Sequence, residues 1–199
     1  MTPEHAQARC GKATSSEFKS VLAKGEGKTR AKYLRQVLAE RLTGLPTETQ
    51  ATGSWAKNLE RGNEQEPYAR MAYEAWAGVM VEESEFYTHA SLEAGCSPDG
   101  KAGPRRGVEI KSVIPTVQIE TILRGGYPAE HVAQIQGGLW ITGWEDWDFV
   151  SYCPEMPEHL RLYTFRVQRD ERYIATLAIE VRGFLEEVET LYQKLMKGE

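Results

Sequence analysis

Apolar residues recur at helical spacing in five segments of the chain, and this period predicts amphipathic α-helices. The third segment begins after Pro67, which suits a first helical position and places Glu66 at or before the first turn. Gly78 is expected to end that helix, and Gly183 is expected to break the last one. The helices are predicted at residues 15–23, 30–42, 68–76, 129–142 and 171–196.

The centre of the chain changes to short runs of β-branched and aromatic residues, bounded by glycine and proline. Strands are predicted at residues 79–86, 88–96, 108–113, 148–152 and 160–168, with a turn at 97–100 and a loop tip at 101–107. Further connections are expected at residues 24–28 and 44–53. Helices before, between and after strands favour an α/β fold, with a central mixed β-sheet flanked by helices. The length suits one domain that spans residues 1–199.

Composition narrows the class of protein. Hydrophobic residues make up 41% and charged residues 27% of the chain, as in an ordinary soluble globular protein. No apolar run approaches the roughly 18 residues of a membrane-spanning helix, and the N-terminal residues lack the apolar core of a secretory signal. We therefore expect a cytoplasmic protein without membrane contact. The three cysteines are widely spaced, so reduced thiols are expected in place of disulfides or a zinc site.

Charge is unevenly distributed along the chain, although its net value is -5. Residues 1–42 carry nine basic and four acidic residues, a net charge of +5. Residues 170–199 carry four basic and seven acidic residues, a net charge of -3. The basic segment could follow a phosphate backbone, but charge alone favours a solvated helix face. No P-loop motif occurs, so ATP-driven translocation is not indicated.

The candidate chemistry lies in the segment SPDGKAGPRRGVEIKS, which occupies residues 97–112. Glu109 and Lys111 alternate on a predicted strand and therefore share a face, while Ile110 points into the core. If the preceding connection is a hairpin, Asp99 lies beside Glu109. Two carboxylates next to a lysine suit a divalent-cation site that hydrolyses a phosphodiester. A surface turn followed by an exposed Glu–Lys pair fits the same letters, and on this pattern alone it is the more common case.

Other polar residues sharpen or limit this hypothesis. Glu66 can supply a third carboxylate from its helix start. Gln134 and Gln136 lie on a mostly apolar helix, where a buried amide needs a partner, either in an active site or on a neighbouring backbone. The four histidines do not cluster in sequence, and none is predicted to be a ligand. Core packing is favoured over base stacking for Trp140, Trp144 and Trp147.

Six segments in this order resemble the lambda exonuclease family of phage recombination nucleases, within the PD-(D/E)xK superfamily. The segments are GxxxEPxAR, SPDG, GVEIK, AQIQGGLWITG, DFVSYCP and FRVQRDERYIA, and they extend from about residue 9 to the C-terminal helix. Each segment is weak by itself, whereas the full ordered set is specific. The resemblance implies a restriction-endonuclease-like α/β core.

The resemblance also implies roles for individual residues. The metal ligands would be Glu66, Asp99, Glu109 and the backbone carbonyl of Ile110, holding two magnesium ions, with manganese as an alternative. Asp99, Glu109, Lys111 and Gln134 would form the catalytic set. A pocket for the 5′-phosphate of the DNA would contain Arg9, Ser16 and Ser97, where the first two come from RCGKATSSEF and the third from SPDG.

The implied activity is magnesium-dependent 5′-3′ hydrolysis of one strand of linear double-stranded DNA. It would release mononucleotides and leave 3′ single-stranded tails for recombination by single-strand annealing. The implied partners are DNA ends, two further copies of this chain in a homotrimeric ring, and a single-strand annealing protein in a bacterial or phage-infected cell. Two alternatives stay open: a PD-(D/E)xK endonuclease or repair nuclease without a ring, and a non-catalytic DNA-binding module on the same fold.

Overall fold

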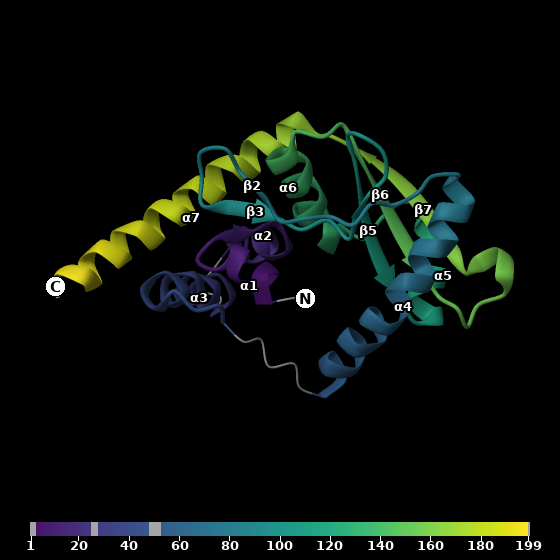
Figure 1. Cartoon of the computed structure of the whole chain (residues 1–199), viewed down its shortest axis with the longest axis horizontal. Coiled ribbons are helices and arrows are strands. Elements are labelled where there is room, and N and C mark those ends of the chain that lie inside the picture. Colours follow the sequence, from purple (N-terminus) through teal and green to yellow (C-terminus); the bar gives the residue numbers. More distant parts are fainter. Residues whose placement is uncertain (1–2, 25–27, 48–52, 199) are drawn as a thin grey trace.

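A four-stranded sheet with the order β4-β5-β6-β7 organises the fold. The computed structural model describes residues 3–24, 28–47 and 53–198, shown in Figure 1. The two central strands, β5 and β6, are parallel, and each outer strand is antiparallel to its neighbour. These strands are β4 (Gly100–Lys101), β5 (Arg106–Ser112), β6 (Asp146–Tyr152) and β7 (Leu162–Gln168). The mixed sheet confirms the predicted α/β class.

A second, three-stranded sheet has the order β1-β3-β2. Its middle strand is parallel to β1 and antiparallel to β2. The strands are β1 (Ala13–Thr14), β2 (Tyr87–Thr88) and β3 (Ala94–Cys96). This sheet connects the N-terminal segment to the chain that leads into β4, so residues near positions 13 and 95 become neighbours.

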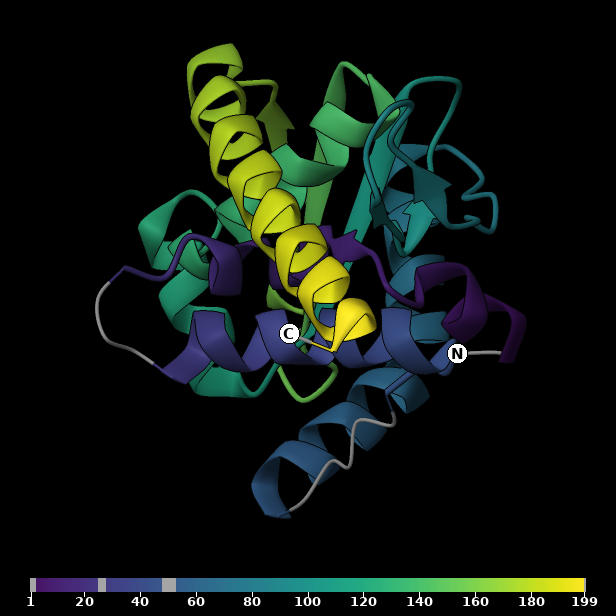
Figure 2. The same cartoon turned by 90° about the vertical axis from the view of Figure 1, so that its left-hand side faces the viewer.

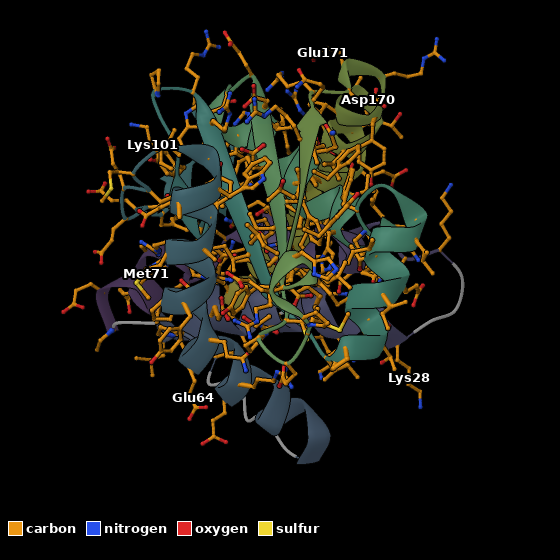
Figure 3. The ribbon with its side chains drawn as sticks, turned by 90° about the vertical axis from the view of Figure 1, so that its right-hand side faces the viewer. Lys28, Glu64, Met71, Lys101, Asp170 and Glu171 are labelled. Atoms are coloured by element: carbon orange, nitrogen blue, oxygen red, sulfur yellow. The ribbon has the colours of Figure 1, made fainter. Side chains whose placement is uncertain are left out.

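Helices cover both faces of the larger sheet. The helical elements are α1 (Pro3–Arg9), η1 (Ser15–Glu17), α2 (Phe18–Val21), α3 (Lys28–Thr43), α4 (Gly53–Ala77), α5 (Pro115–Arg124), η2 (Ala129–His131), α6 (Val132–Thr142), η3 (Glu158–Leu160) and α7 (Glu171–Lys197). On one face, Ala69 and Tyr73 of α4 pack with Val108 and Ile110 of β5. Figure 3 views this face, with the labelled Met71 on the outer side of α4.

The opposite face of the sheet packs against α6. Trp147 and Phe149 of β6 join Ile135 and Leu139 of this helix in one cluster. Glycine makes the close approach possible, because a Cβ at Gly138 would lie 2.6 Å from the Trp147 ring. β6 is buried along nearly its whole length, as expected for a central strand of a sheet whose two faces are both covered by helices.

The longest helix, α7, crosses α3 on the side of the molecule away from α4 (Figures 1 and 2). Tyr33 and Phe184 stack at this crossing with ring centroids 5.3 Å apart. Acidic residues of α7 also pair with the basic N-terminal segment: Arg30 with Glu187 at 2.7 Å, and Arg41 with Glu189 at 3.2 Å. Part of the charge asymmetry in the sequence is therefore neutralised within the chain.

Most predicted helices are present, although the last of them is not broken where the sequence predicts. Helical structure covers the ranges predicted at 30–42, 129–142 and 171–196, and shorter turns of η1 and α2 cover most of 15–23. The predicted break at Gly183 is wrong, because α7 is continuous. Val181 and Phe184 are fully buried on either side of this glycine, and their packing offsets the cost of about 1 kcal/mol for an interior glycine.

The start of α4 was also predicted wrongly. The helix begins at Gly53, so Glu66 and Pro67 lie in its interior and not at its first turn. Contacts with other segments hold the parts of α4 before and after Pro67, although proline has no N–H to donate within the helix. Arg61 donates to the Val113 carbonyl oxygen at 2.8 Å before the proline, and Tyr73 is buried after it.

Two further predictions failed in the middle of the chain. Residues 79–86 contain only an isolated bridge between Glu82 and Lys101, and the strand predicted at 88–96 is divided into β2 and β3. A turn separates these two strands, where the His89 N–H donates to the Ala94 carbonyl oxygen. Helix α5 was missed because its buried side chains, Gln118 and Thr121, are polar, although Pro115 and Gly125 mark its two ends.

The predicted connections at residues 24–28 and 44–53 fall partly outside the described residues. In the part that the structure describes, none of the helices combines the length and apolarity needed to cross a membrane. All three cysteines are free thiols, as predicted. Trp144 and Trp147 are buried and Trp140 is partly buried, which confirms their expected role in packing.

We expect the buried carboxylate of Asp148 to be a main polar support of the sheet. It accepts hydrogen bonds from the Tyr73 hydroxyl at 2.5 Å and from two nitrogens of Arg166 at 2.9 and 3.0 Å. Asp148→Ala leaves both donors without their acceptor and should lower the free energy of unfolding by about 3 kcal/mol. Urea denaturation measures this loss.

The control for this variant is Glu145→Ala. Glu145 forms an exposed pair with Arg105 at 3.1 Å, which should contribute less than about 1 kcal/mol. Equal destabilisation by the two variants would contradict the role given to Asp148.

Candidate active site

Strand β5 supplies the centre of the candidate site. Alternation along the strand places Ile110 in the cluster with α4, while Glu109 and Lys111 face the α6 side. Glu109 is 1% exposed, so its carboxylate lies inside the protein and not on a solvated surface. The structure therefore excludes the interpretation of this segment as an exposed Glu–Lys pair.

The β4–β5 hairpin brings Asp99 to the same place. Gly100 pairs with Val108, and the Asp99 N–H donates to the Val108 carbonyl oxygen at 3.0 Å. The Ile110 N–H in turn donates to Asp99 Oδ2 at 2.7 Å. These bonds hold the Asp99 carboxylate next to residues 109 and 110, as the hairpin hypothesis predicts.

Glu109 is held by two side-chain donors. Lys111 Nζ lies 2.5 Å from Glu109 Oε1, and Gln134 Nε2 of α6 donates to the same oxygen at 2.6 Å. Gln136 is two positions further, about half a helical turn, and instead bonds the Gln168 carbonyl oxygen and the Asp170 N–H. The two glutamines thus divide the two roles that the sequence left open, and Gln134 is the one in the candidate site.

Helix α4 contributes Glu66 and Arg70, which lie one turn apart. Arg70 Nη2 donates to the Asp99 backbone oxygen at 2.9 Å and lies 3.4 Å from Glu66 Oε1. Arg70 therefore connects Glu66 to the hairpin turn. Sequence reasoning missed this arginine, although it occupies the last position of the GxxxEPxAR segment.

The charge of Asp99 affects the other two carboxylates of the site. Burial and the charge of Asp99 raise the pKa of Glu66. The same two causes, in the same order, raise the pKa of Glu109 to about 7 against the opposing effect of Lys111. Burial alone would lower the pKa of Lys111, but the carboxylates of Glu109 and Asp99 raise it. The site therefore concentrates negative charge that a bound cation would stabilise.

The chemistry of these donors fits a hard divalent cation, which prefers carboxylate and carbonyl oxygens. Among the described residues, no three carboxylate, histidine or cysteine side chains are already arranged as a metal cage. Glu109 faces Lys111 and Gln134, Asp99 accepts from Ile110, and Glu66 is near Arg70. These contacts use Glu109 Oε1, Asp99 Oδ2 and Glu66 Oε1, and each carboxylate has a second oxygen that can ligate an ion.

A second polar cluster joins the N-terminal segment to residue 97. Arg9 Nη1 lies 3.5 Å from Ser97 Oγ, and its Nη2 lies 3.3 Å from Ser16 Oγ. The structure thus brings together all three residues expected at a phosphate pocket. His5 and Thr14 also belong to the cluster, through contacts with Ser97 at 2.7 Å and with Ser16 at 3.3 Å. Ser97 lies two residues before Asp99, so the two groups of polar residues are adjacent in the chain.

Two histidines lie near these groups, although sequence spacing gave no signal for them. His5 belongs to the Arg9 cluster. His131, the last residue of η2, stacks on Phe149 with ring centroids 5.4 Å apart, and Phe149 is the register partner of Glu109. Burial, and then the charge of Lys111, lower the pKa of His131 to about 4.

Known proteins resemble this chain in sequence and in structure. The YqaJ-like viral recombinase domain matches residues 4–145. An alkaline exonuclease from Laribacter hongkongensis, LHK-Exo, is 33% identical, with 99% of this chain and 97% of that one aligned at a TM-score of 0.89. Its complex with dAMP matches with a TM-score of 0.90 at the same identity and coverage.

Two more distant likenesses cover different extents. A phage-related exonuclease from Haemophilus somnus 129PT shares the fold with a TM-score of 0.69 at 15% identity, over 92% of this chain and 96% of that one. A protein from Escherichia coli (strain K12) named ExoD is 31% identical over 68 residues, which are 33% of this chain and 77% of ExoD. The likeness to LHK-Exo supports the lambda-exonuclease-like fold inferred from the ordered segments.

His131 should make the stability of the protein depend on pH. Its pKa is about 4 in the folded chain, against 6.5 as the ordinary value, so the unfolded chain takes up this proton first. The free energy of unfolding should therefore fall as pH decreases from about 6.5 towards 4. Denaturation at several pH values should show a shallower decrease for His131→Phe, which keeps the aromatic contact. His159→Phe, at an exposed position, controls for loss of a histidine, and equal slopes for wild type and His131→Phe would contradict the prediction.

Proposed function

Because the chain belongs to the family of YqaJ-like viral recombinases and alkaline exonucleases, which are nucleases of recombination, we propose that it is a metal-dependent 5′-3′ exonuclease of double-stranded DNA. The observation that carries this proposal is the convergence of Asp99, Glu109, Lys111 and Gln134 at the β4–β5 hairpin. Two carboxylates beside a lysine and an amide are the set of groups that metal-dependent hydrolysis of a phosphodiester requires.

The proposed cofactor is magnesium, as two ions per site, with manganese as an alternative. Glu66, Asp99, Glu109 and the Ile110 carbonyl would hold it. When bound, magnesium supplies an activated water and neutralises charge on the phosphate. Lys111 places a compact positive charge where negative charge develops on the phosphate and can orient the attacking water. Gln134 keeps Glu109 in position through its amide N–H.

The proposed substrate is one strand of a linear duplex, degraded from its 5′ end to mononucleotides. The 3′ tail that remains would serve a single-strand annealing protein. Support for a site at the 5′ end comes from the contacts of Arg9 with Ser16 and Ser97, since a guanidinium and hydroxyls suit a phosphate monoester. These side chains would bind the terminal phosphate, and the nearby carboxylates would act in hydrolysis of the first phosphodiester.

Two alternatives differ from this proposal in measurable ways. An endonuclease or repair nuclease with the same site would cut covalently closed circular duplex, whereas an exonuclease needs an end. A non-catalytic DNA-binding module would cut neither. The intact set of Glu66, Asp99, Glu109 and Lys111 favours a catalytic role over the binding module, because DNA binding alone needs no such set of carboxylates.

The test is degradation of a 5′-phosphorylated linear duplex in magnesium, with a closed circular duplex as the parallel substrate. We expect mononucleotide release from the linear substrate only, and none with a chelator. Asp99→Asn keeps an oxygen for the Ile110 N–H but removes the charge, so it should abolish release while leaving the fold intact. Near-wild-type release by folded Asp99→Asn would refute the site, and cleavage of the circle would favour the endonuclease.

Lys111→Ala should separate chemistry from binding. Loss of one group that stabilises the transition state should slow single-turnover cleavage by roughly two to three orders of magnitude. DNA-end affinity should fall only modestly, because one lysine is a small part of the total phosphate contacts. Lys101→Ala removes a partly buried lysine of the same hairpin, which pairs with Glu82, and as the matched control it should cleave at near the wild-type rate. Loss of end binding without loss of the single-turnover rate would show that Lys111 has a different role.

We also propose that the protein assembles as a homotrimeric ring. The support is family resemblance, and the internal pairing of Arg30 and Arg41 with α7 weakens the charge asymmetry as a separate reason. Mass measurement in solution at micromolar concentration should give three copies. A monomer throughout this range would favour the repair-type alternative.

A further inference from the structure

His5 and Arg9 lie one helical turn apart on α1 and meet at the same atom of another segment. His5 Nε2 lies 2.7 Å from Ser97 Oγ, and Arg9 Nη1 donates to that oxygen at 3.5 Å. Arg9 Nη2 donates to Ser16 Oγ at 3.3 Å, and Thr14 Oγ1 lies 3.3 Å from Ser16 Oγ. The five side chains therefore form one continuous polar cluster, with Arg9 at its centre.

The hydrogen-bonding capacity of Ser97 determines what His5 does in this cluster. A serine hydroxyl has one proton to donate and two lone pairs that accept. When His5 Nε2–H and Arg9 both donate to Ser97 Oγ, the two lone pairs are used. The hydroxyl proton must then point away from both residues, where it can bond a third group. An anionic oxygen is the acceptor that such a proton, next to a guanidinium, would bind best.

The surroundings of His5 favour the neutral ring, which donates through Nε2 when its proton is on that nitrogen. Burial, and then the charge of Arg9, lower the pKa of His5, so the ring is held uncharged beside the guanidinium. The ring also contacts Phe86 edge-on, with centroids 6.3 Å apart. Phe86 packs directly over Gly95, where a Cβ would lie 2.1 Å from the Phe86 ring. The chain from Gly95 continues through β3 to Ser97, so the same strand places both the ring contact and the hydroxyl.

We propose that His5 is a positioning residue of the terminal-phosphate pocket, which donates to Ser97 and directs the serine proton toward a 5′-phosphate. This inference rests on the proposed function, because that function supplies a DNA 5′ end as the ligand. It adds to the Arg9, Ser16 and Ser97 set a residue that acts through Ser97. The ligand class is a phosphate monoester at the end of a duplex.

The experiment compares binding of duplexes that carry a 5′-phosphate or a 5′-hydroxyl, in chelator so that no cleavage occurs. His5→Phe keeps an aromatic ring against Phe86 and removes the donor, whereas His5→Gln keeps an N–H donor and removes the ring. The ratio of the two Kd values should fall about three- to tenfold for His5→Phe, the scale of one hydrogen bond. His5→Gln should keep most of the wild-type ratio. In magnesium, His5→Phe should raise KM for phosphorylated ends more than it lowers kcat.

Two controls make the outcome specific. Arg9→Ala should lose more of the phosphate preference than His5→Phe, and His159→Phe, in η3, should keep all of it. Circular dichroism confirms that each variant is folded. An unchanged ratio in His5→Phe, or an equal loss in His5→Gln, would overturn the inference, as would a wild type without phosphate preference. Failure of the proposed function is a separate result, since it appears as a wild type that does not degrade linear duplex in magnesium.

Discussion

The buried contact between Glu109 and Lys111 is the constraint around which the rest of the candidate site is arranged. The two side chains lie on one face of a single strand, and Lys111 Nζ is 2.5 Å from Glu109 Oε1. Only 1% of the glutamate is exposed. An ion pair at such a depth is expensive unless further hydrogen bonds satisfy it. Gln134 of α6 supplies one of these bonds, and this bond connects the helix to β5 at a defined position.

The other face of β5 explains how so polar an arrangement is tolerated. Ile110 and Val108 pack against α4, and Val150 of the parallel neighbour completes this layer. The apolar layer fixes the strand, so the polar side chains on the opposite face are positioned without having to stabilise the strand themselves. The hairpin then adds Asp99, and Arg70 of α4 links Glu66 to the hairpin turn. Contacts outside the site therefore hold the segments that carry its residues.

The two polar clusters are related through one short stretch of chain. Ser97 belongs to the cluster with Arg9 and His5, and Asp99 belongs to the cluster with Glu109. β3 pairs with β1 just before this stretch, and β4 pairs with β5 just after it. The N-terminal segment is therefore brought beside the hairpin by strand pairing. In the function proposed above, this arrangement would place the phosphate pocket next to the hydrolytic site.

The α/β class, the helices with a clear apolar period, and the shared face of Glu109 and Lys111 could all be predicted from the residues alone, because they follow from local periodicity. The ordered segments also identified the family. Local pattern could not reveal that α4 continues through Pro67, that α7 continues through Gly183, or that α5 buries polar residues, because contacts with distant segments outweigh local preference there. The packing of distant segments determines that Gln134 and not Gln136 reaches Glu109, and that His5 reaches Ser97 across 92 positions of chain. Such contacts depend on how helices and strands pack, because the spacing of two residues along the chain does not determine the distance between their side chains in space.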